Sequence, residues 1–352
     1  MGDNPRKHEL PWLNLIFCAM VLWSHCSAHP ITHLDRSSWQ FLLVYLLQRL
    51  SYVSVYGFFL LSGIKLTLPR SRPFSLPDYW AGRMKSIFLP YLLAVAIYQL
   101  WFAWGLRYFP LSLPDFFGYA ARGDLSSHFY FVVGLFQFVL LAPLFRWLSE
   151  RCSPALLLPF ALGITWLSAQ HLPALLQVFW PQLAFRYADR VFLTYFFYYL
   201  AGCYIGRQYE AFVAALRSNR GLVITLFVLF TGANLFFCGI SLTGQRTLPF
   251  LESLHMLYLL SAILFFFLVA VDLPSKMPRW LVRTDRASYL IYLYHCLVIS
   301  MFDNWAAPLG GRIGVLFVLR LAVVYSVTPL ACILWQRFRS ALAPKRPNKA
   351  GF

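Results

Sequence analysis

The sequence predicts an all-α, polytopic integral membrane protein with about ten transmembrane helices and both termini in the cytoplasm. Of its 352 residues, 60% are hydrophobic, 19% are aromatic and only 12% are charged, which is far from the balance of a soluble domain. The hydrophobic residues are gathered in runs of about 17 to 25, the length that crosses a bilayer as a helix. We therefore expect spans at residues 11–28, 46–66, 84–105, 128–148, 154–170, 189–206, 221–240, 250–271, 287–305 and 313–336.

The distribution of charge predicts the orientation of these spans. Most Lys and Arg residues fall in alternate loops and in the two tails, and basic loops stay on the cytoplasmic side. We therefore expect a cytoplasmic tail at 1–10, one transmembrane domain at 11–338 and a basic cytoplasmic tail at 339–352. The formal net charge of +17 is explained by this rule and by attraction to anionic lipid head groups. No nucleic-acid motif accompanies it, so the lipid bilayer is the expected partner and nucleic acid is not.

Several chemistries find no support in the sequence. The seven cysteines show no Cys-x-x-Cys spacing, so we expect neither a disulfide framework nor a metal site. The chain has no Walker loop and no Gly-x-Gly-x-x-Gly, so we expect no bound nucleotide cofactor and no ATP-driven transport.

The first span carries polar groups near both of its ends. His25 is titratable, and an ionisable side chain inside a membrane span is a functional hypothesis by default. Asn14 precedes it by eleven residues, which returns to nearly the same helix face about 16 Å along the axis. The alternative for either residue is a hydrogen bond to a neighbouring helix.

Five local patterns occur in order along the predicted spans. The chain has Ser24-His25 at the end of the first span, then the segments 55–63, 83–91, 127–131 and 288–295, which read VYGFFLLSG, RMKSIFLPY, SHFYF and SYLIYLYH. Taken together, in this order and topology, they resemble the membrane acyltransferase 3 family, whose members are integral-membrane enzymes that acylate sugars and surface glycans. The resemblance covers nearly the whole chain.

The chain departs from the pattern of that family at two positions. Asn14 stands where the family usually has Arg or Lys in the first span. Ser86 stands three residues after Arg83, where the family has a second Arg, although Lys85 keeps a second positive charge nearby.

The resemblance implies transfer of an acyl group from cytoplasmic acyl-CoA to a hydroxyl of an extracytoplasmic polysaccharide or lipid-linked glycan. Acetyl-CoA is the expected co-substrate, and succinyl is an alternative acyl group. The hydroxyl must lose a proton, and an imidazole with an ordinary pKa near 6.5 suits that task at neutral pH. His25 is the candidate catalytic residue, either as general base or as a relay that carries the acyl group itself.

Arg83, Lys85 and Asn14 are the candidate residues for binding the donor. Guanidinium and ammonium groups at a helix end can hold the phosphates of coenzyme A, whereas the alternative is that these cations only fix the topology. His128, Tyr292 and His295 are candidates for contacting the acceptor or lining a tunnel to it. Packed interhelical contacts are the alternative for these three residues.

Two other classes of protein remain open. A glycan or lipid exporter would also show many spans and aromatic linings, and an inert membrane component of a polysaccharide synthesis machine would be no enzyme at all. Inverted repeats, which mark many transporters, are not evident in the sequence. The expected location is the bacterial cytoplasmic membrane, with other polysaccharide-biosynthesis proteins as further candidate partners.

Overall fold

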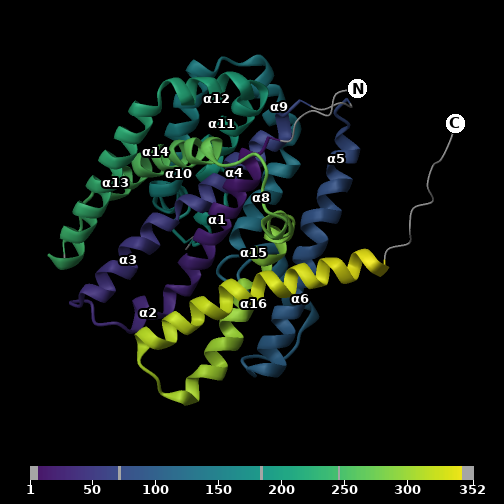
Figure 1. Ribbon diagram of the computed structural model, residues 1–352, viewed down its shortest axis with the longest axis vertical. Coiled ribbons are helices and arrows are strands. Elements are labelled where there is room, and N and C mark those ends of the chain that lie inside the picture. Colours follow the sequence, from purple (N-terminus) through teal and green to yellow (C-terminus); the bar gives the residue numbers. More distant parts are fainter. Residues whose placement is uncertain (1–6, 70–72, 183–184, 245, 343–352) are drawn as a thin grey trace.

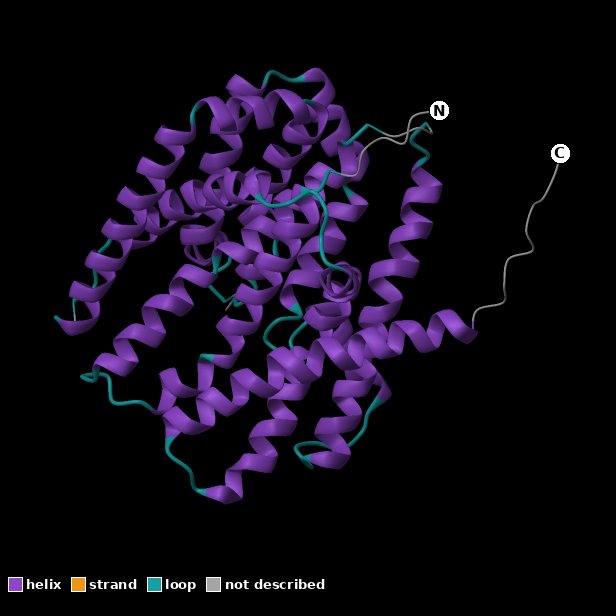
Figure 2. Cartoon of the chain, viewed as in Figure 1, coloured by secondary structure: helices purple, strands orange, loops and turns teal. Residues whose placement is uncertain are grey.

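The computed structural model of the protein describes residues 7–69, 73–182, 185–244 and 246–342, and this part of the chain contains helices and loops but no strand (Figure 2). Its α-helices are α1 (Glu9–Cys26), α2 (Ala28–His33), α3 (Trp39–Ser51), α4 (Val53–Thr67), α5 (Leu76–Arg83), α6 (Leu89–Leu100), α7 (Leu113–Arg122), α8 (Tyr130–Leu140), α9 (Ala142–Arg151), α10 (Pro154–Phe179), α11 (Phe196–Arg207), α12 (Tyr209–Ser218), α13 (Arg220–Thr243), α14 (Leu251–Asp272), α15 (Arg279–Ala306) and α16 (Ile313–Leu342).

The predicted class of fold, a helical multi-pass membrane protein, is confirmed. Within the described residues seven helices are long and apolar enough to cross a membrane, or eight if α8 and α9, bent by 61° at their junction, form one broken span. These eight match eight of the ten predicted spans. The other two are α11, which has 12 residues after a 3₁₀ turn, and α15, which is longer but carries more polar residues. The total of ten spans and the cytoplasmic termini stay predictions, and residues 1–6 and 343–352 of the two tails lie outside the described part.

The third predicted span begins earlier than expected, at Leu76 instead of residue 84. Ser75 caps the helix by accepting a hydrogen bond from the backbone N–H of Asp78, and a proline occupies the first turn, where it costs no hydrogen bond. A π-helical turn at Met84–Phe88 then continues α5 into α6. Arg83 therefore lies inside a continuous helical segment and not at its start. The sequence missed this because residues 76–83 are too polar for a hydropathy window.

The ninth predicted span also begins earlier, at Arg279 instead of residue 287. Its first two turns are polar and are tied to both neighbouring helices, because the Asn14 amide of α1 donates to Asp285 and the Gln336 amide of α16 donates to the carbonyl oxygen of Arg286. Asp285 and Arg286 are consequently helical residues that project from the same element as Tyr292 and His295. This shift brings two charged residues to the candidate site that the sequence alone left in a loop.

Helix α1 lies in the middle of the bundle (Figure 1). It packs against α3, α4, α14, α15 and α16, and it buries Leu13, Phe17 and Val21 among them. At its far end the buried Arg320 of α16 donates to the carboxylate of Asp303 at 2.8 Å and to the carbonyl oxygen of Cys26 at 3.3 Å. A cation inside a span needs such partners. The contact holds the end of α1, next to His25, against α15 and α16.

Helices α4 and α11 approach each other closely along a line of glycines. A Cβ atom added to Gly202 would lie 2.1 Å from the carbonyl oxygen of Leu60, and one added to Gly63 would lie 2.1 Å from that of Tyr199. Small residues allow backbones in a membrane to pack at this distance. Thr67 adds a hydrogen bond across the same interface, from its hydroxyl to the carbonyl oxygen of Cys203 at 2.7 Å. This interface fixes α4, which lines the cavities described below.

We predict that Gly202→Ala destabilises the protein by about 1–3 kcal/mol, because the added methyl group collides with backbone that cannot move aside. Gly232→Ala is the matched control, since a Cβ there meets no atom within 4 Å. Thermal unfolding of the two detergent-purified variants checks the difference. Equal melting temperatures would contradict the close packing of α4 and α11.

Candidate active site

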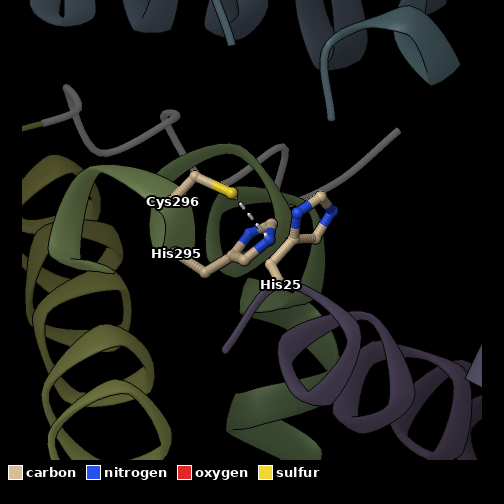
Figure 3. A group of neighbouring side chains, drawn as sticks. All are labelled: His25, His295 and Cys296. Atoms are coloured by element: carbon tan, nitrogen blue, oxygen red, sulfur yellow. Dashed lines mark hydrogen bonds between the residues drawn. The ribbon is translucent and has the colours of Figure 1, made fainter. Parts of the chain in front are cut away.

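Three histidines from distant parts of the sequence meet inside the bundle. His25 ends α1, His128 precedes α8 and His295 lies in α15. The ring centroids are 4.9 Å apart for His25 and His295, 5.8 Å for His25 and His128, and 4.8 Å for His128 and His295. Figure 3 shows His25 of α1 facing His295 and Cys296 of α15. Three of the residues singled out from the sequence therefore form one cluster.

The contacts of His295 assign its tautomer. Its Nδ1 lies 2.7 Å from the carbonyl oxygen of Tyr292, which can only accept, so Nδ1 carries the proton. Its Nε2 lies 3.2 Å from the Sγ atom of Cys296 and accepts a hydrogen bond from that thiol. His295 is fully buried, so its ring is held on both sides within the cluster beside His25.

His128 is also buried and fixed on both sides of its ring. Its Nε2 lies 3.1 Å from the carbonyl oxygen of Leu293 and donates to it, which leaves Nδ1 to accept from the hydroxyl of Ser126 at 3.0 Å. The hydroxyl of Tyr98 donates to the same carbonyl of Leu293 at 3.1 Å. Both ring nitrogens of His128 are thus engaged, so this residue is better placed to hold its neighbours than to exchange protons.

His25 differs from the other two histidines in its hydrogen bonding and in its exposure. Within the described part of the chain no hydrogen bond engages either of its ring nitrogens, and its side chain is partly exposed whereas His128 and His295 are buried. The backbone beside it is held by Gln48 of α3, whose side-chain amide donates to the carbonyl oxygen of Ser24 at 3.0 Å. A side chain that exchanges protons with a substrate needs a fixed backbone and ring nitrogens that are not already hydrogen-bonded. His25 has both.

Tyr292 joins this cluster to a cavity on the side of Arg83. Its hydroxyl donates to the backbone carbonyl of His128, and its ring centroid lies 5.3 Å from that of His128. The opposite side of Tyr292 lines a cavity of about 400 Å³ between α1, α4, α8 and α15. Tyr292 therefore forms part of the wall between the cavity and the histidines.

The cavity brings together the predicted donor residues Asn14 and Arg83. The side-chain amide of Asn14 donates to Asp285 Oδ1 and to the Ser288 hydroxyl, both at 2.7 Å. Lys65 of α4 lines the same cavity, so positive charge is present although Asn14 itself has none. The lining is Asn14, Phe58, Leu61, Ser62, Lys65, Arg83, Ser86, Ile87, Phe131, Leu135, Asp285, Arg286, Ser288, Tyr289 and Tyr292.

Lys85 lines a second cavity of about 400 Å³ that adjoins the first. The two cavities share Ser86, Arg286 and Tyr289, and the second also includes Arg339 of α16. The shared Arg286 lies between the cations of the first cavity and those of the second. Arg70 and Arg72, two further basic residues between α4 and α5, lie outside the described residues.

The histidines and the cations lie toward opposite ends of the same helices. Asn14 and His25 are separated by eleven residues of α1, which is about 16 Å along its axis. A group bound among the cations must therefore extend past Tyr292 to reach His25.

His25, His295 and Cys296 are also able to act as metal ligands. Their candidate ligand atoms all lie within 4.8 Å of one another. Tetrahedral zinc with bonds of about 2.0–2.3 Å places its ligands about 3.3–3.8 Å apart, so the group is wider than a closed zinc site. This group could not be recognised in the sequence, because His295 and Cys296 are adjacent in α15 and His25 lies far away in α1.

The histidines, Tyr292, Asn14, Arg83 and Lys85, which were singled out from the sequence, all lie in the cluster or line the two cavities, and their roles stay predictions. Asp285, Arg286 and Arg339 were not identified from the sequence as lining residues, and their helical positions follow only from the extended α15 and α16. A signal for Arg286 was present, since it stands two residues before the motif at 288–295.

Comparison with known proteins gives the family to which the chain belongs. A family model described as an acyltransferase domain matches residues 8–335, so the chain belongs to the acyltransferase 3 family of membrane proteins. Two curated relatives from Staphylococcus epidermidis each bear the name "Probable poly-beta-1,6-N-acetyl-D-glucosamine export protein". Each is 24% identical to this chain over 302 residues, which are 84% of this chain and 81% of the relative. No solved structure matches the chain.

We predict that Tyr292→Phe lowers acyl transfer by about 2- to 10-fold, because it removes one hydrogen bond, worth about 0.5–1.5 kcal/mol, that positions His128. Tyr294→Phe is the control, since within the described part of the chain the Tyr294 hydroxyl has no hydrogen-bond partner. Initial rates in membranes with matched protein levels compare the two. Equal loss in both variants would show that the bond to His128 is unimportant.

We expect transfer to survive dialysis against a chelator, since an unmetallated imidazole is the group that can take a proton from a hydroxyl. Elemental analysis of the purified protein accompanies the assay. Loss of activity that is restored by added zinc would instead assign His25, His295 and Cys296 to a metal centre.

Proposed function

We propose that the protein transfers an acyl group from acyl-CoA at the cytoplasmic face to a hydroxyl of an extracytoplasmic polysaccharide or lipid-linked glycan. The observation that carries the proposal is the free imidazole of His25, positioned beyond a cation-lined cavity in a member of an acyltransferase family. Membership of this family and the long apolar helices show that the protein is a multi-pass membrane protein of acyltransferase type.

The chemistry of the two adjoining cavities supports acyl-CoA as donor. Coenzyme A carries phosphate groups at one end and the thioester at the other. Lys65, Arg83 and Arg286 in one cavity and Lys85 and Arg339 in the other offer donors for those phosphates. With the phosphates held there, the pantetheine arm points past Tyr292 to bring the thioester carbonyl to His25. Acetyl is the default acyl group and succinyl the alternative.

His25 then acts as general base in the proposed reaction. Its free nitrogen takes the proton of the acceptor hydroxyl while that oxygen attacks the thioester carbonyl, and the carbon–sulfur bond breaks to release the coenzyme A thiolate. The proton returns to the thiolate, which leaves as the thiol, so the products are the O-acyl glycan and coenzyme A. A relay in which His25 itself carries the acyl group uses the same geometry.

The polysaccharide acceptor is proposed from the relatives, whose printed name concerns poly-β-1,6-N-acetylglucosamine. A hydroxyl-bearing polymer at the outer face of a bacterial cytoplasmic membrane fits the opposite placement of cations and histidines in the bundle. Other polysaccharide-biosynthesis proteins are the proposed partners there.

The same printed name supports a second candidate, in which the protein exports the glycan and transfers nothing. An exporter needs no acyl donor, so acyl-CoA dependence separates the two. Loss of the protein would remove surface glycan in the export case, and would remove only its acyl groups in the transfer case.

The test is transfer of radiolabelled acetyl from acetyl-CoA to endogenous glycan in membranes that contain the wild type or His25→Ala. We expect label that is lost at least about 100-fold in the variant, the range that general bases contribute. His33→Ala, an exposed histidine of α2, is the matched control and should keep its label. Folded wild-type protein that transfers no label with either acetyl-CoA or succinyl-CoA would contradict the proposal.

We further predict that Arg286→Ala raises the KM for acyl-CoA by about tenfold, because one charge-assisted hydrogen bond to phosphate is worth about 1.5–3 kcal/mol. The control is Arg217→Ala, an exposed arginine of α12 remote from both cavities. Steady-state kinetics at fixed acceptor concentration give the two values. An unchanged KM in Arg286→Ala would remove this residue from the donor site.

A further inference from the structure

A separate polar cavity lies among α3, α4, α8, α14 and the 3₁₀ turn at Phe192–Tyr195, away from the cations that line the donor side. Its volume is about 250 Å³, and its walls are four tyrosines, one valine and three polar or charged side chains: Arg49, Tyr52, Val55, Tyr56, Tyr130, Tyr195, Glu252 and His255. Tyr56 lies in the first turn of α4, which begins at Val53, whereas the donor cavity is lined by Phe58, Leu61, Ser62 and Lys65 further along the same helix. The cavity around Tyr56 therefore lies nearer the start of α4 than the donor cavity does.

His255 is the unusual residue of this cavity. Its side chain is only 6% exposed, yet neither of its ring nitrogens has a hydrogen-bond partner within the described part of the chain. A buried polar group without a partner costs about 1–3 kcal/mol, and such groups in native proteins call for an explanation. A neutral imidazole offers one donor and one acceptor, which is the complement of a hydroxyl group. A ligand that carries hydroxyls satisfies both nitrogens.

The charges in the cavity are balanced. Arg49 donates to Glu252 at 3.1 Å, to the side-chain oxygen of Asn234 at 3.2 Å and to the carbonyl oxygen of Leu251 at 3.3 Å. Arg49 is buried, while the Glu252 side chain is 52% exposed and keeps acceptor capacity for a ligand. An ion pair with no excess charge favours a neutral polar ligand over an anion or a cation.

Two links join the wall of this cavity to the segments that carry His25 and His128. Gln48, which holds the backbone at Ser24, also accepts a hydrogen bond from the hydroxyl of Tyr52 in the cavity wall at 3.4 Å. Tyr130 of the wall stands two residues after His128. The wall thus shares its supports with the histidine cluster.

A second cavity of about 370 Å³ continues from the first. Both are lined by Tyr56 and Tyr195, and the second adds Asp189, Thr194 and Arg186. Pockets for small molecules have volumes of about 300–1,000 Å³, a range that the two adjoining cavities reach together. The two adjoining cavities have aromatic walls and separate polar groups. Each can therefore hold one unit of a polymer, with consecutive units in consecutive cavities.

We propose that these two cavities form the glycan-binding site, in which His255 and Glu252 hydrogen-bond to the hydroxyls of one sugar unit and the tyrosines pack against sugar rings. The inference rests on the proposed acyl transfer for its role as acceptor site. This site would hold a neutral polyhydroxyl polymer, which the cation-lined donor cavities do not suit. One sugar unit of the bound polymer would be directed toward His25.

The test uses the full-length, detergent-purified protein and short oligomers of β-1,6-linked N-acetylglucosamine. His255→Phe keeps the aromatic volume and removes both nitrogens, and Glu252→Gln keeps the shape and removes the charge. We expect the acceptor KM to rise about tenfold in each, as for the loss of one or two hydrogen bonds, with the Kd for acetyl-CoA unchanged. Arg286→Ala should show the reverse pattern, and His33→Ala neither effect.

Direct binding of the oligomers, measured by calorimetry, separates the failure of this site from the failure of acyl transfer. If the wild type transfers acetyl but His255→Phe keeps the wild-type acceptor KM, the site is wrong and the transfer stands. If the wild type transfers nothing yet binds oligomers, with affinity about tenfold weaker in His255→Phe, the site stands and the transfer is wrong. Wild-type protein that binds no oligomer would overturn the site. Should His255→Phe fail to fold, Glu252→Gln decides alone.

Discussion

Polar groups inside a bilayer must find partners within the protein, and helix α1 carries such groups on one face. Asn14 is tied to Asp285 and Ser288 of α15, and the carbonyl oxygen of Cys26 is tied to Arg320 of α16. These contacts hold α1 against α15 and α16 near both of its ends. His25 is thereby brought beside His295 with its own nitrogens left free, and the arrangement of the rest of the site follows from this fixed pair of helices.

The cavities of the bundle differ in the side chains that line them. Cations gather near the end of α4, at Lys65, whereas four tyrosines and the balanced Arg49–Glu252 pair line the cavity at its first turn, which contains Tyr56. Tyr292 lies between, with its ring in the wall of the donor cavity and its hydroxyl bound to the segment of His128. In the proposed reaction a highly charged donor and a neutral polymer acceptor need different surroundings, and the linings of the two groups of cavities differ in that way.

Much of the helical architecture was predictable, because long apolar runs in the sequence identify membrane-spanning helices. The long apolar helices, His25 and the other two histidines, Tyr292 and Arg83 were all identified from sequence. The polar beginnings of α5 and α15 were not, since packing and capping, rather than apolar length, make residues 76–83 and 279–286 helical. Arg286 and the cavity around His255 were missed for a related reason. Side chains from α3, α4, α8, α14 and a 3₁₀ turn form that cavity, and no single segment carries its pattern.

The central claim is that donor and acceptor reach His25 from opposite faces of the membrane. Acyl-CoA does not cross bilayers, so membrane vesicles of opposite orientation test the claim directly. Labelled acetyl-CoA is added outside inverted vesicles, which expose the cytoplasmic face, and outside right-side-out vesicles from the same cells. The account predicts labelled glycan inside the inverted vesicles alone. Equal labelling in both, or labelling of right-side-out vesicles only, would contradict it.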